Sequence, residues 1–259
     1  MTTTTTTAAR VHPDVRRNAD DTISVTVPAS DFTQALTWVT PAASRDGGPL
    51  AVTNLAYGPG AGHAAHYLPR KEWARKPADD YSLSLAATDR YRLHWTTMAV
   101  PAAEDVAGVT PRWVAPAGSF NLDTKELVAA AKAWPKTPRG LYLIRVTFTE
   151  AGVGDVRLEV LAGDQVIVSQ ILRIADVNFP KYASLVPTPV EGSCPSSVAW
   201  NPIFLADMAK ATKALKVSSL AFRLPSGDDG QVKKAALVVP NEDPEATIAH
   251  SAILMPVKF

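Results

Sequence analysis

The sequence predicts an α+β fold rich in antiparallel strands, and three observations carry the prediction. A pattern of short strand, apolar-periodic helix and about three further strands occurs three times along the chain. The strands alternate polar and apolar residues with period two, and Gly-rich turns such as 150–155 and 226–230 separate them. With 259 residues, of which 46% are hydrophobic, the chain is long enough for one large or two small globular domains.

Residues 1–21 are expected to form a disordered tail. They contain a threonine tract and scattered charges, and they show no apolar periodicity. Such a segment buries too little apolar surface to offset the entropy lost on ordering. The first copy of the repeat therefore begins at Thr22.

Each copy is read as a half-unit, which is a strand, a helix and then about three strands. The first comprises 23–27, the helix 32–39 and strands within 51–55 and 81–100; the second comprises 113–116, the helix 124–134 and strands within 141–148, 156–160 and 166–174; the third comprises 197–200, the helix 203–216 and strands within 220–224, 235–239 and 251–257. An Asp, Ser or Asn precedes each helix as an expected N-cap, and Pro202 stands at a first helical position.

A half-unit with one amphipathic helix and a one-faced sheet cannot bury its apolar surfaces alone. We therefore expect the half-units to pair with one another. The first two copies are expected to close one domain over 22–187, and the third copy is expected to form a separate half-unit over 188–259.

Three motifs stand out beyond the repeat. The stretch 85–93, Leu-Ala-Ala-Thr-Asp-Arg-Tyr-Arg-Leu, is typical of a strand that enters a polar turn and leaves it as a second strand. Phe-Pro-Lys-Tyr begins the stretch 179–187, and Leu-Met-Pro-Val-Lys-Phe ends the sequence. In their order the three resemble motifs of the bacterial DNA polymerase III beta subunit, the sliding clamp.

The resemblance implies the clamp architecture, in which two half-units make one domain, helices line a central hole and antiparallel sheets lie outside. The segment 22–187 resembles the middle clamp domain, and 188–259 resembles the second half of the last domain. The chain is thus expected to be a shortened clamp, and a cellular and a phage origin are both consistent with it.

The resemblance also implies a hydrophobic cleft that binds peptides of a DNA polymerase and of a clamp loader. The matching residues are Thr88, Arg90, Tyr91, Arg92, Leu93, Pro180, Ser184, Leu185, Ile253, Leu254, Met255, Pro256 and Val257. An apolar groove with a flexible Met suits an extended peptide with two or three hydrophobic anchors. Ser184 departs from the family, which commonly has Arg there. The alternative is that these residues belong to strands and core, as Leu93, Leu185 and Leu254 would in either case.

Cationic residues are the candidates for contact with double-stranded DNA. They are Lys125, Lys132, Lys136, Arg139, Lys210, Lys213 and Lys216 on or just after two helices, with Arg70 and Lys71 in the Gly- and Pro-rich insertion 57–80. The net charge is only +1, so DNA binding requires these cations to gather on one surface. The alternatives are ordinary solvated helix faces and a surface loop.

Catalytic and metal chemistry find little support in the sequence. It shows no nucleophile beside a base and no Gly-Lys-Ser/Thr phosphate loop, so we expect a protein that is not an enzyme and needs no cofactor. His63 and His66 have no Cys or carboxylate at ligand spacing, and we expect no metal. A single cysteine, Cys194, no apolar run of membrane-spanning length and no apolar N-terminal signal favour the cytoplasm and no membrane contact.

These observations favour a sliding clamp, or polymerase processivity factor, that encircles duplex DNA as an oligomer. The alternative is a clamp-derived module that binds clamp-binding peptides without encircling DNA. Rings of the resembled family contain twelve half-units, so a chain with three would form a homotetramer. One two-fold axis is expected to pair the third copy with its own equivalent, and a second is expected at the first copy.

Overall fold

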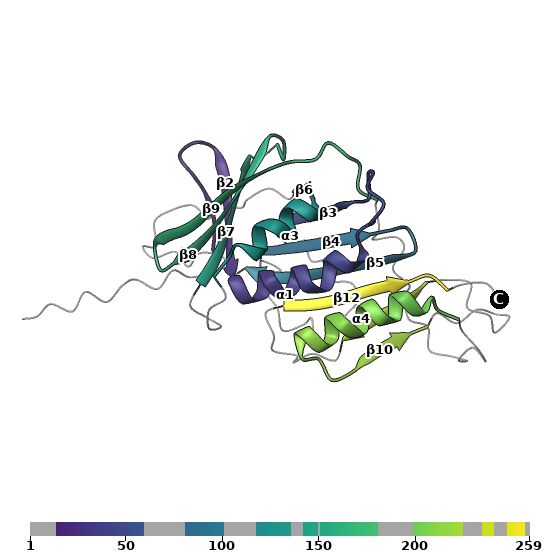
Figure 1. Ribbon diagram of the computed structural model, residues 1–259. Coiled ribbons are helices and arrows are strands. Elements are labelled where there is room, and N and C mark those ends of the chain that lie inside the picture. The colour runs from purple at the N-terminus through teal and green to yellow at the C-terminus, as the bar shows by residue number, and fades with distance from the viewer. Residues whose placement is uncertain are drawn as a thin grey trace, which may run out of the picture.

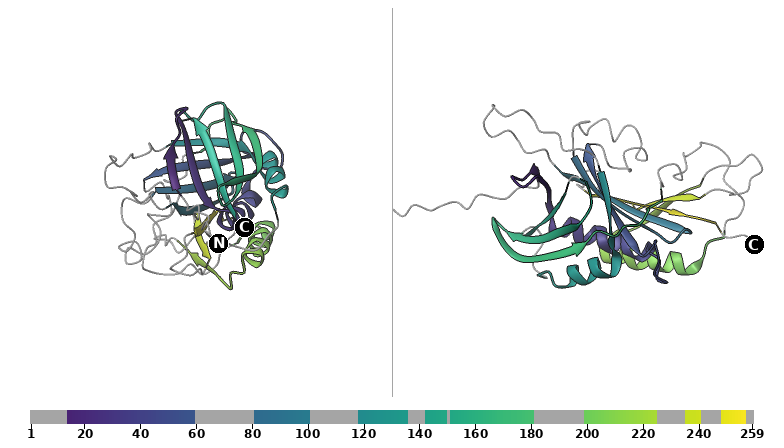
Figure 2. Two further views of the ribbon diagram at one scale, coloured as in Figure 1. Left: turned by 90° about the vertical axis from the view of Figure 1, so that its left-hand side faces the viewer. Right: turned by 90° about the horizontal axis from the view of Figure 1, so that it is seen from above.

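The computed structural model describes residues 14–59, 81–100, 118–135, 142–149, 151–180, 199–224, 235–240 and 248–256. Antiparallel strands form two sheets, and the helices lie together on one side of them (Figure 1; Figure 2, right). The α+β prediction is therefore confirmed.

Sheet A has five strands in the order β1-β2-β7-β8-β9. These are β1 (Asp14–Arg17), β2 (Thr22–Pro28), β7 (Tyr142–Thr149), β8 (Asp155–Ala162) and β9 (Gln165–Arg173). Sheet B has seven strands in the order β10-β11-β12-β5-β4-β3-β6. These are β10 (Leu220–Arg223), β11 (Ala236–Pro240), β12 (Ile248–Leu254), β5 (Arg92–Val100), β4 (Tyr81–Thr88), β3 (Val52–Pro59) and β6 (Gly118–Asp123).

The first two half-units exchange the strands that precede their helices, β2 in the first copy and β6 in the second. The strand expected at 113–116 lies outside the described residues and stays a prediction. β2 of the first copy pairs with β7 of the second, and β6 of the second copy pairs with β3 of the first, both antiparallel. This reciprocal pairing joins the two copies through both sheets. The pairing of half-units expected from their apolar faces is thus present.

Three helices follow the first strands of the copies. They are α1 (Ala29–Val39), α3 (Thr124–Lys132) and α4 (Pro202–Leu215), and a short 3-10 turn η1 (Thr40–Ala42) continues α1. α1 buries Phe32, Leu36 and Trp38 against β4, β5 and β7. α3 buries Leu127 and lies against β6 and β9, with Trp134 just beyond its end 5.7 Å from the Phe32 ring.

The third copy joins the first through strands and helices. β12 pairs with β5 from Ile248↔Met98 to Leu254↔Arg92, so sheet B is continuous across the two copies. α4 lies against α1. The proposed division between residues 187 and 188 falls within 181–198, outside the described residues, and stays a prediction.

The prediction of a disordered tail is wrong for residues 14–17. They form β1, which pairs with β2 along its whole length and turns Val15 toward the core. A tight turn follows, in which Asp20 accepts from the Thr22 hydroxyl at 2.6 Å and Arg17 pairs with Asp21 at 3.0 Å. The strand gains its stability from backbone pairing with a neighbour far more than from its own sequence. Residues 1–13 lie outside the described part.

Two of the three expected N-caps are confirmed. Asp123 accepts from the backbone N–H groups of Lys125 and Glu126, and Asn201 accepts from that of Ile203. In α1 the expectation is wrong, because Pro28 occupies the N-cap position and no side chain caps that helix. Pro28 fixes its own φ at −57°, which suits this position without a side-chain hydrogen bond.

The third copy differs from the other two at its first strand. Ala199 and Trp200, the described residues of the expected strand 197–200, form no strand. In the other copies this strand is paired with a strand of another half-unit, and no described strand pairs with Ala199 or Trp200. Across the described residues, no helix has the length and apolar character that crossing a membrane requires.

Candidate functional site

The turn between β4 and β5 is built by its own polar side chains. The Asp89 carboxylate accepts from the backbone N–H groups of Tyr91 and Arg92 at 3.1 and 3.0 Å. The Thr88 hydroxyl donates to the Arg92 carbonyl at 2.7 Å and accepts from the Arg90 backbone N–H. These bonds hold Arg90 at φ 79°, a conformation that a non-glycine residue adopts only under such constraint.

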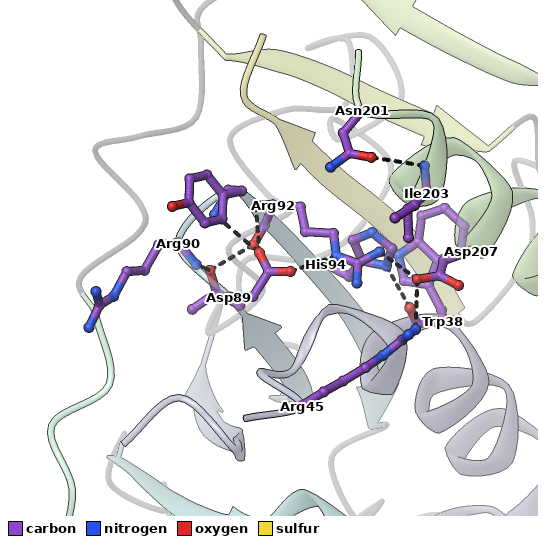
Figure 3. Close-up of polar contacts among 11 residues, drawn as sticks. Trp38, Arg45, Asp89, Arg90, Arg92, His94, Asn201, Ile203 and Asp207 are labelled. Atoms are coloured by element: carbon purple, nitrogen blue, oxygen red, sulfur yellow. Dashed lines mark hydrogen bonds and ion pairs between the residues drawn. The ribbon is translucent and has the colours of Figure 1, made fainter. Parts of the chain in front are cut away.

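Arg92 lies at the centre of an ion network that joins the first and third copies (Figure 3). Its Nε donates to Asp89 at 3.0 Å and its Nη1 donates to Asp207 of α4 at 2.9 Å. Asp207 also accepts from Arg45 at 3.0 Å. The guanidinium of Arg92 lies 4.5 Å from the centre of the Phe204 ring, and its side chain is only 3% exposed.

A pocket of about 450 Å³ opens beside this network. Its walls come from the segment after α1, the β4–β5 turn, the start of α4 and the end of β12. The lining residues are Ala43, Ser44, Arg45, Asp46, Asp89, Tyr91, Arg92, Asn201, Ile203, Phe204, Met255 and Pro256. The structure therefore brings Tyr91 and Arg92 of the first motif together with Met255 and Pro256 of the last.

A backbone bond fixes the last motif against the first. The Met255 N–H donates to the Tyr91 carbonyl at 2.9 Å, just beyond the end of the β12–β5 pairing. Both side chains remain accessible, Tyr91 at 64% and Met255 at 42%. Exposed apolar groups held on a rigid backbone are suited to contact a partner.

Other residues expected in the cleft lie elsewhere. Leu93 and Ile253 belong to a buried cluster with Trp95 and Leu237, against which Phe179 packs, and Leu254 is fully buried in the main core. Thr88 is buried in the turn, Arg90 and Pro180 are exposed and line no part of the pocket, and Ser184, Leu185 and Val257 lie outside the described residues. Leu93, Ile253 and Leu254 are therefore core residues, as expected for Leu93 and Leu254 with or without a cleft.

Sequence reasoning missed the wall that α4 and the α1 connection provide. Arg45 and Asp207 are 162 positions apart in the sequence, so no short sequence motif contains both. Ile203 is apolar, yet it is 58% exposed and lines the pocket. It stands in the first turn of α4. An acidic residue on the buried stripe, Asp207, was the one signal that could have pointed to a buried ion pair.

Two buried histidines lie under the network at the β5–β12 junction. The His94 ring stacks on Trp38 at 5.1 Å and its Nδ1 donates to the Trp38 carbonyl, while His250 Nδ1 bonds Thr96 at 2.7 Å. Burial lowers the pKa of His94 to about 4, against the opposing effect of its bond to Trp38. Burial also lowers the pKa of His250 to about 3. Both rings are therefore neutral at physiological pH.

The candidate lysines stand on the outer faces of two helices. Lys125 and Lys132 of α3, Lys210 and Lys213 of α4, and Lys216 just after it are exposed, opposite the buried Leu127, Ala130, Met208 and Ala211. The helices that carry these lysines lie on one side of the sheets (Figure 2, right). Arg70, Lys71, Lys136 and Arg139, with the insertion residues 60–80 and His63 and His66, lie outside the described residues.

Comparison with known proteins finds similarity at the level of structure only. No protein-family model matches the sequence. No curated protein matches it either.

Solved structures do match, and bacterial clamps are among them. The DNA polymerase III beta subunit of Thermotoga maritima aligns with a TM-score of 0.58 and 14% identity over 91% of this chain and 65% of that one. A Caulobacter crescentus beta sliding clamp aligns with a TM-score of 0.60 and 12% identity over 93% and 67%. The DNA polymerase III beta chain of Streptococcus pneumoniae aligns with a TM-score of 0.57 and 11% identity over 96% and 77%.

The resemblance inferred from three short motifs is therefore confirmed for the fold. This chain spans 65% of the Thermotoga maritima protein, and identities of 11–14% show architecture rather than activity. The protein has the fold of the bacterial DNA polymerase III beta subunit, the sliding clamp, in a shortened form.

Proposed function

We propose that the protein is a DNA sliding clamp, a processivity factor that encircles duplex DNA as an oligomer and tethers a polymerase through the pocket at Tyr91 and Met255. The observation that carries the proposal is the meeting of the β4–β5 turn, the end of β12 and the start of α4 in one pocket on a clamp fold. The role requires no catalytic chemistry and no cofactor, and we propose the cytoplasm as its location.

The pocket has the composition of a receptor for an extended peptide. Tyr91, Ile203, Phe204 and Met255 offer apolar surface, and Met adapts to varied side chains. Arg45 stands at the rim, 69% exposed and oriented by Asp207. A polymerase or loader peptide with two or three hydrophobic anchors and a polar group facing Arg45 fits this arrangement.

The helix side supports contact with DNA. Lysines on α3 and α4 face away from the core, and phosphate contacts without base contacts provide affinity independent of sequence, as sliding requires. Lys210 is 81% exposed and forms a long ion pair of 4.0 Å with Asp207, and we propose that it contacts a phosphate instead when DNA is bound. Arg70, Lys71, Lys136 and Arg139 are proposed to add to this surface.

α1 favours the second candidate function, a peptide-binding module that does not encircle DNA. The exposed and half-buried residues of this helix include Thr33, Gln34 and Thr37 and no cation. A helix without cations between two lysine-bearing helices weakens the attraction to a duplex. Retention on DNA distinguishes the two candidates, since both predict peptide binding.

The third copy supports self-association. β10 pairs with β11 on one side and with no described strand on the other, and Phe222 is 40% exposed. Its counterpart β3 lies between β4 and β6 and is buried throughout its described side chains. We propose that a second copy completes this domain across a two-fold axis, as the first two copies complete each other, and that the ring is a homotetramer.

Peptide binding tests the cleft. Calorimetry with a clamp-binding peptide of a bacterial replicative polymerase should show at least a tenfold loss of affinity for Tyr91→Ala and for Met255→Ala, because each removes apolar surface from the pocket. Arg90→Ala is the matched control, since Arg90 shares the turn but lines no part of the pocket. Equal affinities in all three variants would remove the cleft assignment.

A further inference from the structure

Trp38 of α1 lies where the first and third copies join, beside His94 (Figure 3). Its indole N–H donates to the Ser251 carbonyl of β12 at 2.8 Å, and its own carbonyl accepts from His94 Nδ1 of β5 at 2.7 Å. These bonds attach one residue of α1 to both sides of the β5–β12 pairing. The contact between the two copies therefore depends on this point of the junction.

Two buried histidines lie on the same face of the β5–β12 junction. His94 pairs with Ala252, and His250 pairs with Thr96, so the two histidines are diagonal neighbours across the strands. The Trp38 ring lies 5.1 Å from the His94 ring and 5.8 Å from the His250 ring. The histidines are 0 and 2% exposed. Water reaches both rings when β12 separates from β5 and from α1.

His94 is poorly placed to accept a second proton. Its Nδ1 donates to the Trp38 carbonyl, and its buried Nε2 bonds no described group. Protonation of Nε2 creates a buried cation whose new N–H has no acceptor among the described residues, which is costly. Burial lowers the pKa of His94 to about 4, with a smaller contribution from Arg92. The bond to Trp38 and the carboxylates of Asp89 and Asp207 oppose this effect without cancelling it.

His250 lies in similar surroundings, and burial lowers its pKa to about 3. Its Nδ1 forms a hydrogen bond with the Thr96 hydroxyl. The other charged groups on α1, on the segment after it and on α4 are Asp31, the exposed Arg45 and the exposed Lys210 and Lys213. For both rings burial is a larger effect than any nearby charge, and separation of the strands removes it.

We propose that the β5–β12 junction is a pH-sensitive contact, which opens in mildly acidic solution and releases the third copy while the first two copies stay folded. Opening lets both histidines take up protons in water, and such clusters of histidines respond to pH in other interfaces. The pairings that hold the first two copies together, β2 with β7 and β3 with β6, contain no histidine. Acid therefore weakens the junction selectively.

Opening also takes the pocket apart, because Tyr91 belongs to the first copy and Met255 follows the last strand of the third. The protein should therefore release a bound peptide in mild acid. This consequence rests on the proposed function, whereas the opening itself does not.

The lowered pKa values set the size of the effect. Each histidine titrates at about 6.5 when exposed, so each should favour the open form by roughly thirtyfold at pH 5 relative to pH 8. The two together should raise the population of the open form by about a thousandfold.

Thiol labelling of the full chain measures this opening. In a Cys194→Ser background, Ser251→Cys places a thiol of similar size on β12, where Ser251 is 5% exposed. Dithiodipyridine, which reacts with thiols in mild acid, labels it when the junction opens. Its rate with the folded protein, divided by its rate with the urea-unfolded protein, should rise about a thousandfold from pH 8 to pH 5.

Two controls locate the opening and its cause. Val146→Cys of β7 reports on the first two copies, since Val146 is fully buried in sheet A, and at pH 5 it should label at least about tenfold more slowly than Ser251→Cys. His94→Gln or His250→Gln, added to Ser251→Cys, should each reduce the rise to roughly thirtyfold, and both together should abolish it. A circular dichroism melt at pH 8 shows that each variant is folded.

The outcomes separate this inference from the proposed function. A labelling ratio of Ser251→Cys that does not change with pH, or equal ratios for Ser251→Cys and Val146→Cys at pH 5, would overturn the opening of the junction. A rise that persists without both histidines would overturn their role. Because labelling needs no peptide, a protein that opens as described but binds no clamp-binding peptide at pH 8 would refute the cleft and leave the pH-sensitive junction standing.

Discussion

Asp207 joins the third copy to the first through a buried ion pair, and its replacement gives the sharpest stability prediction. It is 7% exposed and binds Arg92, which is 4% exposed, as well as Arg45. Asp207→Ala leaves the buried guanidinium with Asp89 as its only carboxylate. Breaking a buried ion pair from one side costs about 3–5 kcal/mol.

Arg45→Ala removes the other partner of the same carboxylate, yet it should cost far less. The Arg45 side chain is 69% exposed, and a pair that is exposed on one side contributes about 0–1 kcal/mol. Urea denaturation measures both variants, and an unchanged m-value would show that the unfolded state is unaffected.

A double variant checks the cause. Replacing a buried ion pair by apolar residues is often neutral. Asp207→Ala combined with Arg92→Met should therefore be more stable than Asp207→Ala alone, despite one more substitution. Equal losses for Asp207→Ala and Arg45→Ala, or additive losses in the double variant, would refute the description of Arg92 as a buried charge that Asp207 compensates.

Two further predictions concern pH and DNA. Folding lowers the pKa of His94 from 6.5 to about 4 and that of His250 from 6.5 to about 3, so below pH 6.5 the unfolded chain binds more protons than the folded one. The free energy of unfolding should therefore decrease as the pH is lowered from 6 to 4, by up to roughly 3 kcal/mol per pH unit. Melting temperatures at these pH values check it, and a variant with both histidines changed to Gln that keeps the full slope would contradict it. Changing Lys132, Lys210 and Lys213 together to Glu should lower affinity for duplex DNA and flatten its dependence on salt; an unchanged slope would return these lysines to a solvated role.

The sequence predicted the repeat well because each half-unit has a strong local pattern. The helix periodicities, the Asp123 and Asn201 caps and the alternation of β4 and β5 are properties of short segments. β1 escaped prediction because its strand exists only through pairing with β2.

The site was predicted in part, for a similar reason. Successive residues of a strand point to opposite faces, so Arg92 and Leu93 of β5 cannot both line one pocket. Met255 lies beyond the end of β12 and lines the pocket, whereas Leu254, the last residue of that strand, is buried in the core. The motif resemblance had placed all four of these residues in the cleft. The α4 wall, with Asp207 and Phe204, depends on how the third copy packs against α1, which no local pattern contains.

Negative-stain electron microscopy of the purified 259-residue protein tests the central claim most directly, because a sliding clamp must be a closed ring. The account predicts class averages that show closed rings with an open centre, each formed by four copies and two-fold symmetric. Compact single copies or open filaments would contradict it.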